Sequence, residues 1–140
     1  MIRKLTHEDY NMLYKLWDNT PGMGLNPIDD SYEGIKKYLD RNPETSFGAF
    51  ENDILAGAIL CGHDGRRGFI HHTAVSLEYR NKGIGKALLD AAINALEKEG
   101  ISKAMLVVFK DNEIGNIFWE KQGFTVRNDL NYRNKSIKNI

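Results

Sequence analysis

The chain has 140 residues, of which 41% are hydrophobic and 27% are charged, so we expect one globular domain spanning residues 1–140. Lys plus Arg and Asp plus Glu both number 19, and this balance argues against a nucleic-acid partner. Cys61 is the single cysteine and no segment resembles a signal peptide or a membrane span, so we expect a cytoplasmic protein without disulfides or a membrane partner.

The N-terminal third predicts one short strand and two helices. The strand is expected in "IRKL", after which Thr6 is placed as the N-cap of a helix that ends before "NTPGMGLNP". Ser31 is expected to cap the second helix, whose apolar positions follow at helical spacing: Ile35, Tyr38 and Leu39.

The middle third changes to the alternating pattern of strands. "SFGAFEND" and "ILAGAILCG" predict two strands joined by a turn at Asn52-Asp53. After the turn "DGRRG", the segment "FIHHTAV" predicts the third strand of a meander.

The C-terminal half predicts alternating helices and strands. A helix should end at Gly100, and "KAMLVVF" is apolar enough for a central strand covered on both faces. Asp111 or Asn112 is expected to cap the last helix, and a last strand should start at Phe124. The whole order predicts an α+β fold around one mixed sheet.

The segment "EYRNKGIGKALL" combines glycines and basic residues at the start of a helix. Helix N-termini carry unpaired N–H groups, and glycines let the backbone close around a bound group. With Arg80, Lys82 and Lys86 nearby, the segment predicts a site for an anion such as phosphate or pyrophosphate. The alternative is a plain turn with solvated charges.

Three phosphate-loop motifs can be compared with this segment. A Walker loop is excluded because position 80 is Arg and position 87 is Ala. A dinucleotide fingerprint is excluded because Leu88 occupies the third glycine position. The remaining pattern, R-x-x-G-x-G, fits residues 80–85.

This segment resembles motif A of the GCN5-related N-acetyltransferase (GNAT) family. The resemblance runs through "HHTAVSLEYRNKGIGKALLDAAINALEKEG" and continues in "LVVFKDNEIGNIFWEKQGF". Six residues of the second stretch fall in the family register N-x-x-A-x-x-F-Y-x-x-x-G-F: Asn112, Gly115, Phe118, Trp119, Gly123 and Phe124. "GHDGRRG" also resembles the bacterial YpeA-type branch.

The resemblance implies a GNAT-like, acyl-CoA N-acyltransferase fold with a mixed sheet of about six to seven strands and helices on both faces. It implies acetyl-CoA as acetyl donor and a primary amine, on a small molecule or peptide, as acceptor by direct attack; it also allows a homodimer. The residues implied to bind acetyl-CoA are Ala74, Val75, Arg80, Asn81, Lys82, Gly83, Ile84, Gly85, Lys86, Asn112 and Trp119.

The position of the family's usual catalytic acid is occupied by Trp119 instead of tyrosine. An indole N–H can donate a hydrogen bond but is no practical acid. Either another group protonates the leaving thiolate, or no protein acid is needed. A non-catalytic acyl-CoA-binding module is therefore an alternative function.

His71 is the preferred candidate for the general base, and the alternative is a hydrogen-bonded structural histidine. Adjacent strand residues face opposite sides, so we expect only one of His71 and His72 to face the acceptor, with His71 sharing a face with Phe69 and Thr73. For the same reason a metal site built from His63, His71 and His72 is not expected.

The acceptor remains open in the sequence. Asp29 and Asp30 could attract a cationic amine or could form a solvated helix entry. Arg66 and Arg67 could hold a carboxylate or could be exposed charges of a turn. Acetylation of protein lysines or N-termini is a third option, although Val107 replaces the glutamate of the branch that acetylates ribosomal-protein N-termini.

Overall fold

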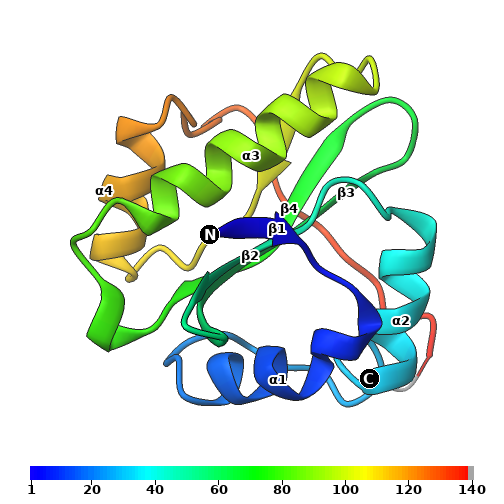
Figure 1. Ribbon diagram of the computed structural model, residues 1–140. Coiled ribbons are helices and arrows are strands. Elements are labelled where there is room, and N and C mark those ends of the chain that lie inside the picture. The colour runs from blue at the N-terminus through cyan, green and yellow to red at the C-terminus, as the bar shows by residue number, and fades with distance from the viewer. Residues whose placement is uncertain (139–140) are drawn as a thin grey trace. The chain divides into compact units, whose positions relative to one another are not determined.

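The computed structural model describes residues 1–138 and divides into two compact units, Met1–Leu106 and the segment from Val107 onward (Figure 1). The second unit contains helix α4 (Glu113–Lys121). The elements of the first unit are β1 (Ile2–Lys4), η1 (His7–Asp9), α1 (Tyr10–Asp18), α2 (Tyr32–Arg41), β2 (Phe47–Glu51), β3 (Ile54–His63), β4 (Gly68–Val75), η2 (Leu77–Tyr79), α3 (Ile84–Lys98) and β5 (Ala104–Leu106).

The first unit is built on one sheet with the strand order β1-β2-β3-β4-β5. Neighbouring strands are antiparallel from β1 to β4, whereas β4 and β5 are parallel, so the predicted α+β fold with a mixed sheet is confirmed. The sheet has five strands. The sequence resemblance implies about six to seven strands, so this part of the prediction is wrong.

The C-terminal strand predictions account for this difference. The predicted strand in "KAMLVVF" is reduced to β5, which lies at the sheet edge rather than in its centre, and Met105 is 49% exposed. The strand expected from Phe124 is not formed among the described residues. An apolar run alone does not reveal whether a neighbouring strand will pair with it.

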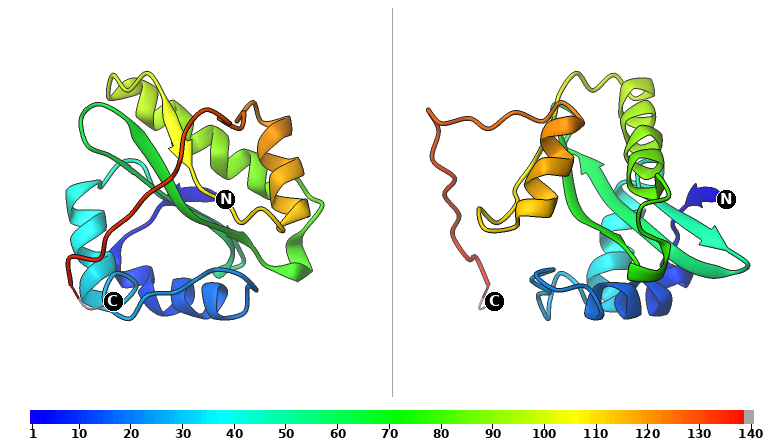
Figure 2. Two further views of the ribbon diagram at one scale, coloured as in Figure 1. Left: turned by 180° about the vertical axis from the view of Figure 1, so that it is seen from behind. Right: turned by 90° about the vertical axis from the view of Figure 1, so that its left-hand side faces the viewer.

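Helices cover both faces of this sheet, as the views in Figures 1 and 2 show. Helix α3 buries Leu88, Leu89, Ala92 and Leu96 on one face. The core on the other face joins α1 and α2 to the strands through Leu13, Leu16, Trp17, Ile35, Leu39, Ala58, Leu60 and Ala74. Each helix has an apolar stripe at helical spacing. The helix is stabilised when this stripe is buried against a face of the sheet.

Local signals in the sequence form the predicted turns and caps. Asn52 and Asp53 join β2 to β3 with φ values of 51° and 67°, the positive values that a tight two-residue hairpin turn requires. Ser31 accepts a hydrogen bond from the Gly34 N–H at 3.0 Å and so caps α2. Gly100 follows α3 with a φ of 79°.

The second unit, taken by itself, contains one capped helix. The Asn112 side chain accepts a hydrogen bond from the Gly115 N–H at 2.9 Å at the start of α4, as predicted. Gly123 ends the helix with a φ of 91°. No helix in residues 1–138 combines the length and the apolarity that crossing a bilayer would take.

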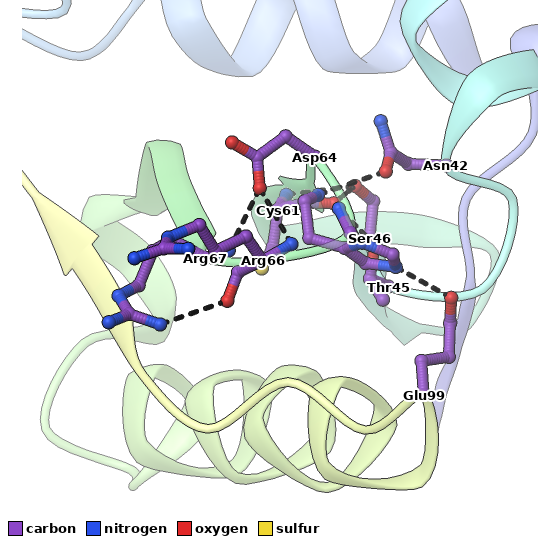
Figure 3. Close-up of polar contacts among 10 residues, drawn as sticks. Asn42, Thr45, Ser46, Cys61, Asp64, Arg66, Arg67 and Glu99 are labelled. Atoms are coloured by element: carbon purple, nitrogen blue, oxygen red, sulfur yellow. Dashed lines mark hydrogen bonds and ion pairs between the residues drawn. The ribbon is translucent and has the colours of Figure 1, made fainter.

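A buried polar cluster joins the start of β2 to β3 (Figure 3). The hydroxyls of Thr45 and Ser46, both 1% exposed, donate to the Cys61 carbonyl at 2.6 and 3.0 Å. Ser46 Oγ also accepts from the Cys61 N–H at 2.9 Å. The β2–β3 pairing begins at Phe47–Ile59, so the Ser46 hydroxyl satisfies backbone groups that the strand pairing does not reach.

We predict that Ser46→Ala lowers the free energy of unfolding by about 1–3 kcal/mol, because the buried Cys61 N–H loses its acceptor. Urea titration followed by circular dichroism measures the change. Ser136→Ala is the matched control, since Ser136 is exposed and its substitution should change stability by less than about 0.5 kcal/mol. Equal effects of the two substitutions would contradict this role of Ser46.

Candidate active site

The predicted anion loop lies between η2 and α3 in the first unit. Asn81 and Gly83 have φ values of 63° and 79°, so the chain turns through the left-handed region before the helix begins. The first helical hydrogen bond of α3 runs from the Ala87 N–H to the Gly83 carbonyl at 3.1 Å. The N–H groups of residues 84–86 therefore have no helical acceptor, which is the geometry of an anion site.

Three basic side chains surround this loop. Arg80 Nε donates to the Val75 carbonyl at 3.1 Å, and Lys82 Nζ lies 5.5 Å from the centre of the Tyr79 ring. Lys86 forms an exposed ion pair with Asp90 at 2.8 Å. The loop thus combines free backbone donors with positive charge, a combination that suits phosphate groups.

Within the first unit, strand β4 has no strand partner on its β5 side beyond Ile70. It pairs with β5 only from Gly68 to Ile70, although it continues to Val75. Ala74 and Val75 still pair with β3 on the other side, opposite Ala58 and Gly57. The open edge of β4 can therefore accept an extended ligand through backbone hydrogen bonds.

An irregularity in β4 changes the direction of its histidines. Thr73 pairs with Ile59 and Ile70 pairs with Cys61, so two residues of β4, His71 and His72, stand opposite the single residue Leu60. Such a β-bulge turns the two adjacent side chains to the same face. The prediction that His71 and His72 face opposite sides is therefore wrong, and by alternation Thr73 lies on the other face.

Both histidines line one cavity of about 760 Å³ in the first unit. Its other walls are the loop before α2, one side of α2 and Leu60 of β3. The charged and aromatic residues that line it are Asp29, Asp30, Glu33, Lys37, Tyr38, Arg41, His71 and His72. The cavity is large enough for a small polar molecule or a peptide end.

His72 is held by two contacts inside this cavity. Its Nε2 lies 2.7 Å from Asp30 Oδ1, and its ring meets the Trp17 ring edge-on with centroids 4.9 Å apart. Burial opposes the charge of Asp30, but hydrogen bonds from His72 and from the Asn26 N–H outweigh it and lower the pKa of this carboxyl below its usual range. Asp30 is therefore a carboxylate that accepts the proton on His72 Nε2.

His71 makes aromatic contacts rather than hydrogen bonds. The centroid of its ring lies 4.6 Å from the ring centroid of Phe69 and 5.5 Å from that of Tyr38. Although the residue reaches solvent at the cavity, enclosure by these neighbours and then the proximity of His72 lower the pKa of His71 below its usual value. At neutral pH His71 is an uncharged imidazole that can accept a proton.

The predicted site residues of the second unit are described by themselves. Asn112 uses its side-chain oxygen as a helix cap, so its amide group is the part left for a ligand. The ring centroid of Trp119 lies 5.0 Å from that of Phe118 and 5.3 Å from that of Phe124. The indole N–H can donate a hydrogen bond but is not a practical acid.

Several other candidates take no part in this cavity. Arg66 and Arg67 stand on the β3–β4 turn, where their backbone N–H groups donate to Asp64, and they do not line the cavity. Burial raises the pKa of the Cys61 thiol to about 12, which makes it a poor nucleophile. Within residues 1–138, no group of three or more His, Cys, Asp or Glu residues is arranged to hold a metal ion.

Sequence reasoning missed the link between Asp30 and His72. The sequence indicates that Asp30 either attracts an amine or belongs to a solvated helix entry, and regular alternation along the strand places His72 away from the acceptor. The residues are 42 positions apart in sequence, and a bulge has no signature in a segment such as "FIHHTAV".

Comparisons with known proteins agree with this geometry. The family model described as the acetyltransferase (GNAT) family matches residues 10–124. An acetyltransferase of Sodalis glossinidius is 28% identical over 129 residues, covering 92% of this chain and 89% of that protein. N-alpha-acetyltransferase 30 of Schizosaccharomyces pombe is 34% identical over 105 residues, covering 68% of this chain and 70% of its own.

A solved structure shows the same fold. The PaiA N-acetyltransferase of Thermoplasma acidophilum, crystallised in complex with coenzyme A, superposes with a TM-score of 0.78 at 27% identity. The match covers 91% of this chain and 90% of the other. Helices on both faces of a mixed sheet are therefore the acetyltransferase architecture, as the sequence resemblance implied.

We predict that Gly34→Ala displaces the cavity loop from α2. A Cβ atom at position 34 would lie 2.4 Å from the carbonyl oxygens of Ile28 and Asp29, far inside van der Waals contact. The expected loss is about 1–3 kcal/mol in the free energy of unfolding, measured by urea titration. Lys36→Ala on the same helix removes only an exposed ion pair and should cost at most about 0.5 kcal/mol. A Gly34→Ala variant as stable as wild type would contradict this packing.

Proposed function

Because the chain belongs to the acetyltransferase (GNAT) family, we propose that it moves an acetyl group from acetyl-CoA to a primary amine bound in the cavity beside His71 and His72. One observation carries this proposal: β4 combines a free edge, a neighbouring cationic loop and two histidines that face the same cavity. Donor and acceptor can therefore meet on a single strand.

The donor site proposed from the sequence fits the residues present. The free N–H groups at the start of α3 and the charges of Arg80, Lys82 and Lys86 suit a diphosphate. The open edge of β4 at Ala74 and Val75 suits an extended amide-containing chain, as in the pantetheine arm of CoA. Bound acetyl-CoA would supply a thioester whose carbonyl can be attacked by an amine.

The residues proposed for the pyrophosphate are Arg80, Asn81, Lys82, Gly83, Ile84, Gly85 and Lys86. For Asn112 and Trp119 of the second unit, contact with acetyl-CoA stays a prediction from the family resemblance. The sequence of motif A and the capped start of α4 support these assignments.

The acceptor must lose its positive charge before it can attack, because an alkylamine with a pKa of about 10 is mostly protonated at neutral pH. We propose that His71 takes this proton, since it lines the cavity, is uncharged at neutral pH and makes no hydrogen bond within the described residues. Asp29 lines the same cavity and can attract the ammonium group.

Two observations favour different acceptors or no acceptor. The similarity to an N-alpha-acetyltransferase favours the amino end of a peptide. The indole at position 119, where an acid is usual, favours a module that binds acyl-CoA without transfer. A homodimer stays a prediction from the family resemblance.

A thiol-release assay with acetyl-CoA separates these functions. The acceptor panel contains simple alkylamines, polyamines, amino acids and short peptides with free N-termini. Thiol release with any of them supports the transferase. Binding of CoA in calorimetry without thiol release from any acceptor would instead support the binding module.

We predict that Gly83→Ala weakens CoA binding at least about fivefold. An alanine in the left-handed region costs about 1–2 kcal/mol, so the free loop should leave the conformation that binding requires. Gly100→Ala is the matched control, since Gly100 has the same φ of 79° and open space around it but lies at the other end of α3. Both variants should lose stability, and only Gly83→Ala should lose affinity in calorimetry. Equal affinities would contradict the loop as the CoA site.

We predict that His71→Ala lowers kcat/KM by about 10²- to 10⁴-fold at neutral pH. In wild type the rate should fall as pH drops through the lowered pKa of His71, because the protonated ring cannot accept another proton. The variant should lack this inflection, so its rate should follow the free amine. The control is Phe69→Leu, which changes a neighbour of His71 and should keep the inflection. A pH–rate profile of His71→Ala identical to that of wild type would rule out His71 as the general base.

A further inference from the structure

Asp30 is fixed from four directions in the loop before α2. Its carboxylate accepts from His72 Nε2 and from the Asn26 N–H, both at 2.7 Å. Its backbone N–H donates to the Asn26 carbonyl at 3.0 Å, and its own carbonyl accepts from the Tyr10 hydroxyl at 2.7 Å. With 6% of its surface exposed, Asp30 is a buried and rigid acceptor.

This arrangement fixes the state of His72. A carboxylate can only accept, so the His72 nitrogen that faces Asp30 carries the proton. In a neutral imidazole the other nitrogen, Nδ1, then holds the lone pair, and it makes no hydrogen bond within the part of the chain that the structure describes. The edge-on contact with Trp17 keeps the ring from turning.

The bulge gives this pair access to the acceptor. Without the extra residue in β4, one of the two histidines would face α3 instead of the cavity. With it, an oriented His72 lines the same space as His71, which makes no hydrogen bond within residues 1–138. A histidine oriented and charge-stabilised by a buried carboxylate is the arrangement that enzymes use for general bases.

Resting on the proposed acetyl transfer, we propose that His72 is a second catalytic base, with Asp30 as its positioning residue. An ammonium nitrogen loses two protons on the way to an amide, and one histidine cannot hold both. His71 takes the first proton before attack and releases it to water. His72 Nδ1 takes the second as the nitrogen–carbon bond forms.

His72 then donates this proton, which came from the amine, to the CoA thiolate when the carbon–sulfur bond breaks. The products are the amide and the free thiol, and one proton is released to water for each ammonium consumed, so atoms and charges balance. Asp30 stabilises the imidazolium between these two transfers. His72 in this way supplies the acid that Trp119 cannot supply.

The test uses two variants of the full-length chain. Asp30→Asn cannot accept from both the Asn26 N–H and His72 Nε2, so it should move the His72 proton to Nδ1 and remove the lone pair from the cavity. His72→Gln can still donate to Asp30 but has no basic nitrogen, so it separates the base from the structural link. Asp40→Asn is the matched control, because it makes the same substitution at an exposed position of α2 that does not line the cavity.

Nitrogen NMR of the imidazole rings provides the readout that needs no acceptor. Wild type should show His72 protonated at Nε2, and Asp30→Asn should show protonation at Nδ1. With an acceptor from the amine panel, Asp30→Asn and His72→Gln should lower kcat about 10²- to 10⁴-fold. In these two variants the KM of the acceptor and the affinity for CoA should change less than about threefold, and so should the activity of the Asp40→Asn control.

Each failure has a distinct signature. If wild type transfers acetyl groups, two results would overturn the His72–Asp30 base. One is an unchanged kcat in either variant, and the other is a wild-type His72 that is protonated at Nδ1. Wild type that binds CoA but transfers to no acceptor would overturn the proposed transferase function, and the second base with it. If Asp30→Asn loses its fold, kcat of His72→Gln decides the question.

Discussion

The candidate site depends on one extra residue in β4. The bulge places His71 and His72 opposite Leu60 alone, and so turns two consecutive side chains toward the same cavity. A regular strand would present one histidine to the cavity and the other to α3. The exposure of both histidines to one cavity and the placement of His72 near Asp30 follow from this local break in the pairing, and the proposed proton transfers depend on it.

The loop before α2 is the second requirement, because it supplies the carboxylate that orients His72. Hydrogen bonds from Tyr10 and within the Asn26–Asp30 turn hold it, and the missing side chain of Gly34 lets it approach α2. A rigid loop is costly to order, yet a general base needs a fixed partner. The same hydrogen bonds thus stabilise the fold and define a proton acceptor.

The anion loop, in contrast, is a local structure. Its positive φ values at Asn81 and Gly83, its basic side chains and the free N–H groups of α3 all come from one continuous stretch of chain. The family match over residues 10–124 includes this stretch, and the solved relative with coenzyme A has the same fold. The loop is therefore set by local sequence, whereas the cavity beside His71 and His72 is built from segments that are far apart in the chain.

The sequence by itself determined the α+β order, the caps at Ser31 and Asn112, the Asn52–Asp53 turn, the glycine loop and the family. These features depend on neighbouring residues, so periodicity and motif spacing reveal them. Only the tertiary structure decided the strand count, the edge position of β5, the bulge and the Asp30–His72 pair. These depend on which segments meet across the fold, and alternation along a strand holds only until an inserted residue shifts the pairing.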